Sequence, residues 1–239
     1  MPDPTPTPTP APGPEPREKG TRNIVNQQDL EDLKYGEKVA KIAQGSDYLD
    51  VMAANKITAP FLTALATDAG TARQQAAKIV ELNEARKAAT RVEAGAKKDM
   101  MTALRGLQKA ARSEFEASDP AKLSAFCIGK AGFPGPREVL EVDAQAIIDQ
   151  AAASLPGLAP AELTAAAGLL KAWQAADDGQ SKAEEDLGKA HDTFDAQVES
   201  VNTRRRKVLW AVDRKWPCTD KANGAIRRAF GLSPDRPMQ

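Results

Sequence analysis

Residues 61–116 of this 239-residue chain read FLTALATDAGTARQQAAKIVELNEARKAATRVEAGAKKDMMTALRGLQKAARSEFE. The stretch contains no proline, and its apolar residues recur every three or four positions, which places them on one face of an α-helix. An unbroken helix of this length would extend about 84 Å at 1.5 Å per residue, with Gly95 and Gly106 as possible bends. The sequence therefore predicts an elongated all-α protein. The helical face consists of Leu62, Leu65, Ala69, Ala72, Ala76, Ile79, Leu82, Val92, Met100, Leu104, Leu107, Ala111 and Phe115.

Capping and breaking residues predict where the first helices begin and end. Residues 58–60 (Thr-Ala-Pro) form a start signal for the long helix, because proline is well tolerated in a first turn. Upstream, Asp29 is a candidate N-cap for a helix that continues to about Met52. Gly36 and Gly45 are the positions at which this upstream helix could loosen.

The second half of the chain repeats the order of these signals. Asp119 is a candidate cap for a short helix that should stop at Gly129, where the loop 129–136 separates two units. A shorter helix follows and ends at about residues 155–157 (Leu-Pro-Gly). A second long helix then opens at Pro160 and closes before Pro217 and a last short helix.

A faint duplication accompanies this order. Leu62-Thr63-Ala64 recurs as Leu163-Thr164-Ala165, about 101 residues later. The other matched pairs are Thr102 with Thr203, Arg105 with Arg206, Ala110 with Ala211, Phe115 with Trp216, and Asp119 with Asp220. We predict two tandem helical repeats, residues 27–132 and 133–239, each led by one long helix and packed together as one bundle of coiled-coil type.

Residues 1–26 are expected to form a disordered Pro/Thr-rich tail. Residues 2–16 read PDPTPTPTPAPGPEP, with proline at almost every second position, so this tract lacks both a hydrophobic face and many backbone donors. The favoured interpretation is a spacer. A docking peptide for a proline-reading domain and a glycosylated stalk are alternatives.

Composition limits the possible partners and locations. Aromatic residues make up 5% of the chain, and 33 basic residues balance 33 acidic ones, so the chain as a whole is neither a polycation nor a polyanion. No run of eighteen apolar residues is present, so no membrane span is expected. The N-terminus lacks the pattern of a signal peptide, which predicts a cytoplasmic protein unless Met1 replaces a cleaved leader.

The neutral total conceals a segregation of charge between the two long helices. Residues 73–112 carry ten Lys or Arg against four acids, whereas residues 177–199 carry eight acids against two Lys. Complementary charge selects partner and register more than it adds stability. We expect the two long helices to lie antiparallel against each other. Pairing of the same stretches between two chains is the alternative.

The strongest candidate binding site is the basic end of the second long helix. Its members are Arg204, Arg205, Arg206, Lys207, Arg214, Lys215, Arg227 and Arg228, with Trp210 and Trp216 among them. The simplest interpretation is structural: the cations complement the helix dipole, and the tryptophans lie on the buried stripe with Val208 and Val212. An acidic protein partner is the next interpretation. Nucleic acid is a less favoured one, although cations and flat side chains suit phosphates and bases.

Other residues give weaker signals. His191 is the sole histidine and is expected on solvated surface; no Glu-x-x-His pair accompanies it, which argues against a di-iron centre. Cys127 and Cys218 are expected to be reduced thiols, and the acidic residues at 177–186 lack calcium-loop spacing. No glycine-rich phosphate loop is present, since residues 129–135 lack the Gly-Lys-Ser/Thr ending. The sequence predicts neither a metal site nor a cofactor.

These features predict a non-catalytic structural or protein-interaction protein, with heterologous binding or self-association through its elongated surface. The alternative is a nucleic-acid-associated protein that uses the basic C-terminal end. An enzyme is the third possibility.

Overall fold

The computed structural model describes residues 25–128 and 136–238, and every regular element in these two ranges is a helix. The predicted tail and the predicted loop between the units lie almost entirely outside the described residues. The elements are α1 (Gln27–Ala43), α2 (Leu49–Ala54), α3 (Ala59–Phe115), the 3₁₀ helix η1 (Pro120–Phe126), α4 (Arg137–Ser154), α5 (Pro160–Lys215), the 3₁₀ helix η2 (Lys221–Asn223) and α6 (Gly224–Ala229).

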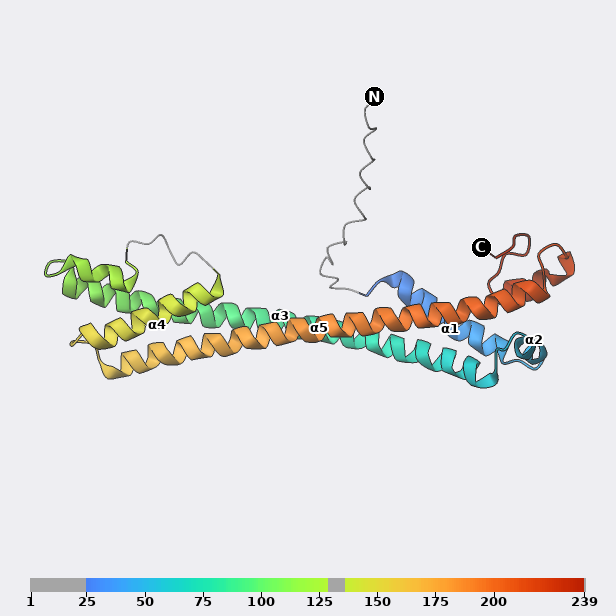
Figure 1. Cartoon of the computed structure of the whole chain (residues 1–239), viewed down its shortest axis with the longest axis horizontal. Coiled ribbons are helices and arrows are strands. Elements are labelled where there is room, and N and C mark those ends of the chain that lie inside the picture. Colours follow the sequence, from blue (N-terminus) through green and yellow to red (C-terminus); the bar gives the residue numbers. More distant parts are fainter. Residues whose placement is uncertain (1–24, 129–135, 239) are drawn as a thin grey trace, which may run out of the picture.

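Two long antiparallel helices, α3 with 57 residues and α5 with 56, form a rod (Figure 1). At 1.5 Å per residue each is about 85 Å long. Gly95 and Gly106 lie inside α3, and a Cβ added at either would meet nothing within 4 Å, so both belong to the exposed side of the helix. The all-α elongated bundle is confirmed, but Val92, expected on the apolar face of the first long helix, is 62% exposed. The starts of α3 at Ala59 and α5 at Pro160 have the spacing expected of the repeat, but the duplication itself stays a prediction.

Side chains cap both long helices where the sequence predicts a start. The Thr58 hydroxyl accepts a hydrogen bond from the backbone N–H of Phe61 at 3.4 Å at the start of α3. At the start of α5 the Glu162 carboxylate accepts from the backbone N–H of Ala159 at 3.3 Å. These bonds satisfy donors that have no partner within the helix.

Three of the expected boundaries were wrong. Asn26 rather than Asp29 caps α1, its side-chain oxygen accepting from Gln28 N at 3.0 Å. The upstream helix does not continue unbroken to Met52: α1 ends at Ala43, close to Gly45, and α2 begins at Leu49. Asp119 occupies the N-cap position of a 3₁₀ helix that begins at Pro120, where a start is expected, but its carboxylate makes no capping bond and lies 3.3 Å from the Lys122 ammonium. That element ends at Cys127, whose backbone is left-handed with φ 55°, ahead of the predicted stop.

Each end of the rod has its own apolar core. The first core joins α1, α2, α6, the first half of α3 and the second half of α5; the second joins η1, α4 and the remaining halves (Figure 1). The largest fully buried side chains of the first core are Leu33, Met52, Ile57, Leu62, Leu65, Ile79, Phe194 and Phe230. Those of the second are Met100, Phe126 and Trp173. The shorter helices thus complete a bundle at both ends, as the sequence predicts.

The seam between the long helices is polar in the middle of the rod. Glu93 is only 7% exposed and accepts a hydrogen bond from Trp173 Nε1 at 2.8 Å. Arg137, from the first turn of α4, lies 3.7 Å from the Glu93 carboxylate and also contacts the Asp177 carboxylate. A buried carboxylate needs such partners, because leaving it unpaired away from water is costly.

The antiparallel register brings the two charged stretches partly opposite each other. Gln75 Nε2 donates to the backbone carbonyl of Ala190 at 3.4 Å, and Glu93 lies opposite Trp173. The first part of the basic stretch 73–112 therefore faces the acidic stretch 177–199. Within these stretches lie the ion pairs Lys87–Glu84 and Lys189–Glu185, each inside one helix.

Candidate interaction site

Arg204 and Arg205 are partly buried and form ion pairs within the bundle. Arg204 lies 2.5 Å from the Asp68 carboxylate of α3. Arg205 bonds both the carboxylate and the backbone carbonyl of Asp32, at 3.0 and 3.1 Å, and its guanidinium lies 4.8 Å from the centre of the Tyr35 ring. Two members of the predicted site thus fasten α5 to α3 and α1.

Tyr35 links the same region to the C-terminal segment. Its hydroxyl donates to the backbone carbonyl of Phe230 at 2.5 Å. Burial raises the pKa of the Tyr35 hydroxyl; the positive charge of Arg205 lowers it to a smaller extent, and the negative charge of Asp32 raises it. The phenol is therefore neutral over the ordinary pH range and acts as a hydrogen-bond donor.

Arg227 is fully buried and fixes the hook formed by the C-terminal residues 217–238. Its Nη1 contacts the Asp213 carboxylate at 2.5 Å and donates to the Trp216 carbonyl at 2.8 Å. Nε donates to Ser233 O and Nη2 to Arg236 O, both at 2.7 Å. Only the planar, forked guanidinium can reach so many acceptors at once, so this residue is structural.

The remaining cations lie on the surface. The Lys207 ammonium is 5.1 Å from the centre of the Phe61 ring, a cation–π distance. Arg206, Arg214, Lys215 and Arg228 are exposed, and none forms an ion pair with another described residue. Of the eight residues predicted for the site, these five are exposed.

Trp210 was expected on the buried stripe, and this prediction is wrong: its side chain is 59% exposed. Val208 and Val212 are buried as expected, and Trp210 lies two residues from each, about 200° away around the helix. This two-residue spacing already predicts that Trp210 lies on the opposite side of the helix from Val208 and Val212. Trp216, by contrast, packs on the first core with its ring edge-on to Tyr48 at 5.6 Å between ring centres.

Arg206, Trp210 and Arg214 form what we call the Trp210 face. They are spaced four residues apart, so they lie along one side of the last turns of α5. The three residues share the backbone of one regular helix, so their positions relative to one another are fixed. Tryptophan and arginine are the residue types most enriched among those that dominate binding energy in protein interfaces.

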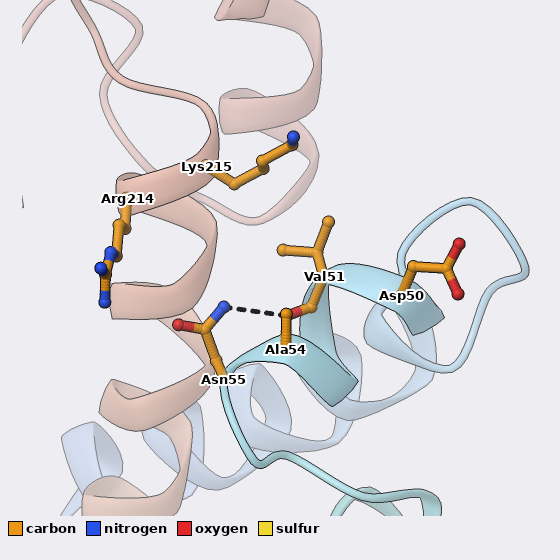
Figure 2. Close-up of a pocket in the computed structure, with 6 residues that line it drawn as sticks. All are labelled: Asp50, Val51, Ala54, Asn55, Arg214 and Lys215. Atoms are coloured by element: carbon orange, nitrogen blue, oxygen red, sulfur yellow. Dashed lines mark hydrogen bonds between the residues drawn. The ribbon is translucent and has the colours of Figure 1, made fainter.

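A hollow of about 430 Å³ lies beside this face, between α2 and the end of α5 (Figure 2). It is lined by Asp50, Val51, Ala54, Asn55, Arg214 and Lys215. Figure 2 shows Lys215 extending toward α2 near Val51, whereas Arg214 lies on the side of α5 away from α2. The Asn55 side chain is occupied, since its amide donates to the Val51 carbonyl at 2.8 Å.

The other candidate residues do not converge on a site. His191 is half-buried rather than on solvated surface, and its Nε2 is enclosed without a hydrogen-bond partner among the described residues, which corrects the expectation. Cys127 and Cys218 form no disulfide: Cys127 follows η1 and packs in the second core, whereas Cys218 follows the end of α5. Across residues 25–128 and 136–238 no group of three metal-ligating side chains gathers, and no helix there is both long and apolar enough to cross a bilayer.

The sequence gives no sign that two residues important to the architecture are buried. Glu93 and Arg227 are charged residues at positions that only the tertiary structure buries, one between the long helices and the other under the C-terminal hook. Comparison with protein-family models, curated proteins and solved structures gives no significant match to this chain.

Proposed function

We propose that this chain is a non-catalytic interaction protein: a helical rod that binds a protein partner through the Trp210 face at the end of α5. The observation that carries the proposal is the 59% exposure of an indole between two arginines without an ion-pair partner among the described residues. A tryptophan and two arginines on one exposed helix side are the residue types that most often dominate the binding energy of protein interfaces.

The charge of the face defines the kind of partner. Arg206 and Arg214 would be matched by carboxylates, and the indole by an adjoining apolar or small-residue surface. The long helices keep the face far from the α4 end of the rod, so a structural spacer role is compatible with binding at one end.

A photoreactive residue in place of Trp210 tests the proposal in cells that produce the protein naturally. We expect a discrete covalent adduct that disappears when Arg206→Glu and Arg214→Glu are added. The matched control places the same residue at Val92, which is 62% exposed on α3. Absence of an adduct at position 210, or identical adducts at both positions, would contradict the proposal.

A second candidate function is binding of single-stranded nucleic acid, which the exposed indole between cations also favours. Against it, the same side of α5 carries Asp192 and Glu199 within a few turns of Arg206, so a polyanion longer than the face would be repelled. A fluorescently labelled 20-nucleotide oligomer at low salt tests it. Binding lost in Arg206→Glu/Arg214→Glu would support this function, and no binding would end it.

A further inference from the structure

The outer surface of α5 carries both signs of charge in a fixed order. Four exposed carboxylates recur every seven residues and are followed, at the next seven-residue step, by Arg206. They are Asp178, Glu185, Asp192 and Glu199. A seven-residue step keeps side chains on nearly the same side of a helix, so the acidic stripe leads directly into the Trp210 face.

We propose that the partner of the Trp210 face is a second copy of this chain, with the α5 outer surfaces antiparallel about a two-fold axis. The inference rests on the proposed function and specifies its partner. A two-fold contact needs a self-complementary surface, in which residue i of one copy meets j of the other and j meets i. A helix side that is acidic along one part and basic along the next satisfies this when it is reversed against itself.

The register follows from one pair. With Arg206 of one copy opposite Asp192 of the other, each step forward on one helix is matched by a step backward on its partner. Trp210 then lies opposite Gly188, and Arg214 opposite Glu184 and Glu185. Gly188 is exposed, and a Cβ built there would meet nothing within 4 Å, so the helix leaves room for the indole at the place where the register needs it.

The stem of Lys189 lies beside that position. The Lys189 ammonium is held by Glu185 at a fully exposed site, a pair that solvent screens and that can exchange partners at little cost. Lys189 can therefore lie over the indole face when Arg214 of the other copy approaches Glu185. Arg206, Arg214 and Lys189 thus find an opposite charge or an aromatic ring across the contact.

One contact in this register is unfavourable. Glu199 falls on the two-fold axis and meets Glu199 of the second copy, which limits the strength of the dimer. The complex is mainly polar and is anchored by one aromatic residue per copy, so we expect association at protein concentrations on the order of 10–100 µM.

Charge exchange between two variants tests the register on the full-length chain by sedimentation velocity in about 50 mM salt, where exposed charges interact over more than about 10 Å. Arg206→Glu/Arg214→Glu should reduce the association constant at least tenfold, and so should Glu185→Lys/Asp192→Lys. An equimolar mixture of the two variants should restore a dimer. Lys98→Glu/Arg105→Glu, a matched reversal of two exposed cations on α3, should leave wild-type association unchanged.

Glu199→Gln should strengthen the dimer several-fold, because it removes the like-charge contact at the axis. Circular dichroism of each variant should show unchanged helix content, since all the substituted side chains are exposed. A wild-type chain that stays monomeric at about 500 µM, or a mixture that stays monomeric, overturns the inference. Such a result leaves the proposed function standing if the photoreactive residue at 210 captures a different protein, whereas a dimer-sized adduct supports both.

Discussion

Replacement of Arg227 by methionine should release the C-terminal hook from the rod. Methionine keeps much of the side-chain volume but removes all the donors that reach Asp213 and the carbonyls of Trp216, Ser233 and Arg236. The side chain is 0% exposed, while the Asp213 carboxylate is 24% exposed. Water can therefore reach Asp213 in part, but it reaches the guanidinium site only if the hook opens.

The expected magnitude follows from these contacts. Removal of one partner from a buried ion pair costs about 3–5 kcal/mol. The packing of the hook on the rod contributes a free energy of similar magnitude. Burial of one side chain such as Phe230, which is 0% exposed, contributes about 1.5–3 kcal/mol. Because the two quantities are comparable, we expect the hook to open while α3 and α5 stay folded.

Hydrogen exchange measured by mass spectrometry separates the two regions. In Arg227→Met, amides of residues 217–238 should exchange at least 100-fold faster, and amides of α3 between residues 100 and 111 should be unchanged. Arg227→Lys, which keeps the charge but loses the forked geometry, should fall between wild type and Arg227→Met. Unchanged protection of the hook in Arg227→Met would refute the structural role of Arg227.

Three further predictions test other contacts. Trp173→Phe removes the hydrogen-bond donor to buried Glu93 and should lower the free energy of unfolding by about 1–3 kcal/mol in urea titrations. In a Glu93→Leu background the same substitution should lower it by less. An equal loss in both backgrounds would exclude the hydrogen bond. Gly36→Ala should destabilise the protein by about 1 kcal/mol net, because the new Cβ would lie 2.8 Å from Val201 Cγ1. Gly106→Ala, where a Cβ meets nothing within 4 Å, should stabilise it by about 1 kcal/mol. Equal shifts in melting temperature for the two variants would contradict the close contact of Gly36 with Val201. The pKa of Tyr35 is raised in the folded state, so the neutral phenol stabilises the fold below pH 10. This contribution is lost as the pH rises through the pKa of the folded state. Urea titrations from pH 9 to 11 should therefore show a steeper loss of stability in wild type than in Tyr35→Phe.

Local signals in the sequence predicted the helices, and tertiary contacts decided the rest. Pro60, Pro160 and Pro217 lie at helix boundaries. Proline restricts the backbone and lacks an N–H donor wherever it occurs, so these boundaries could be predicted from the sequence. Periodicity found Val208 and Val212. The same periodicity places Trp210 on the opposite side of the helix, although tryptophan is a residue type that is highly buried on average.

The parts that could not be predicted are those in which a polar residue is buried. Arg227 and Glu93 resemble the many solvated charges of this chain, and what distinguishes them are acceptors and donors brought from distant segments, such as Trp173. The run Arg204-Arg205-Arg206 predicts a single basic site, but consecutive residues of a helix point in directions about 100° apart. Helical geometry therefore separates this basic run into residues that hold the bundle and residues that face outward.

The separation of the apolar residues into two cores has a consequence for how the rod melts. Apolar burial is concentrated at the ends, and the connecting stretch is polar around Glu93 and Arg137. The two ends are therefore coupled mainly through helix continuity, so each can lose its structure as a separate cooperative unit. Calorimetry should then record two overlapping transitions, and a substitution in one core should displace only one of them.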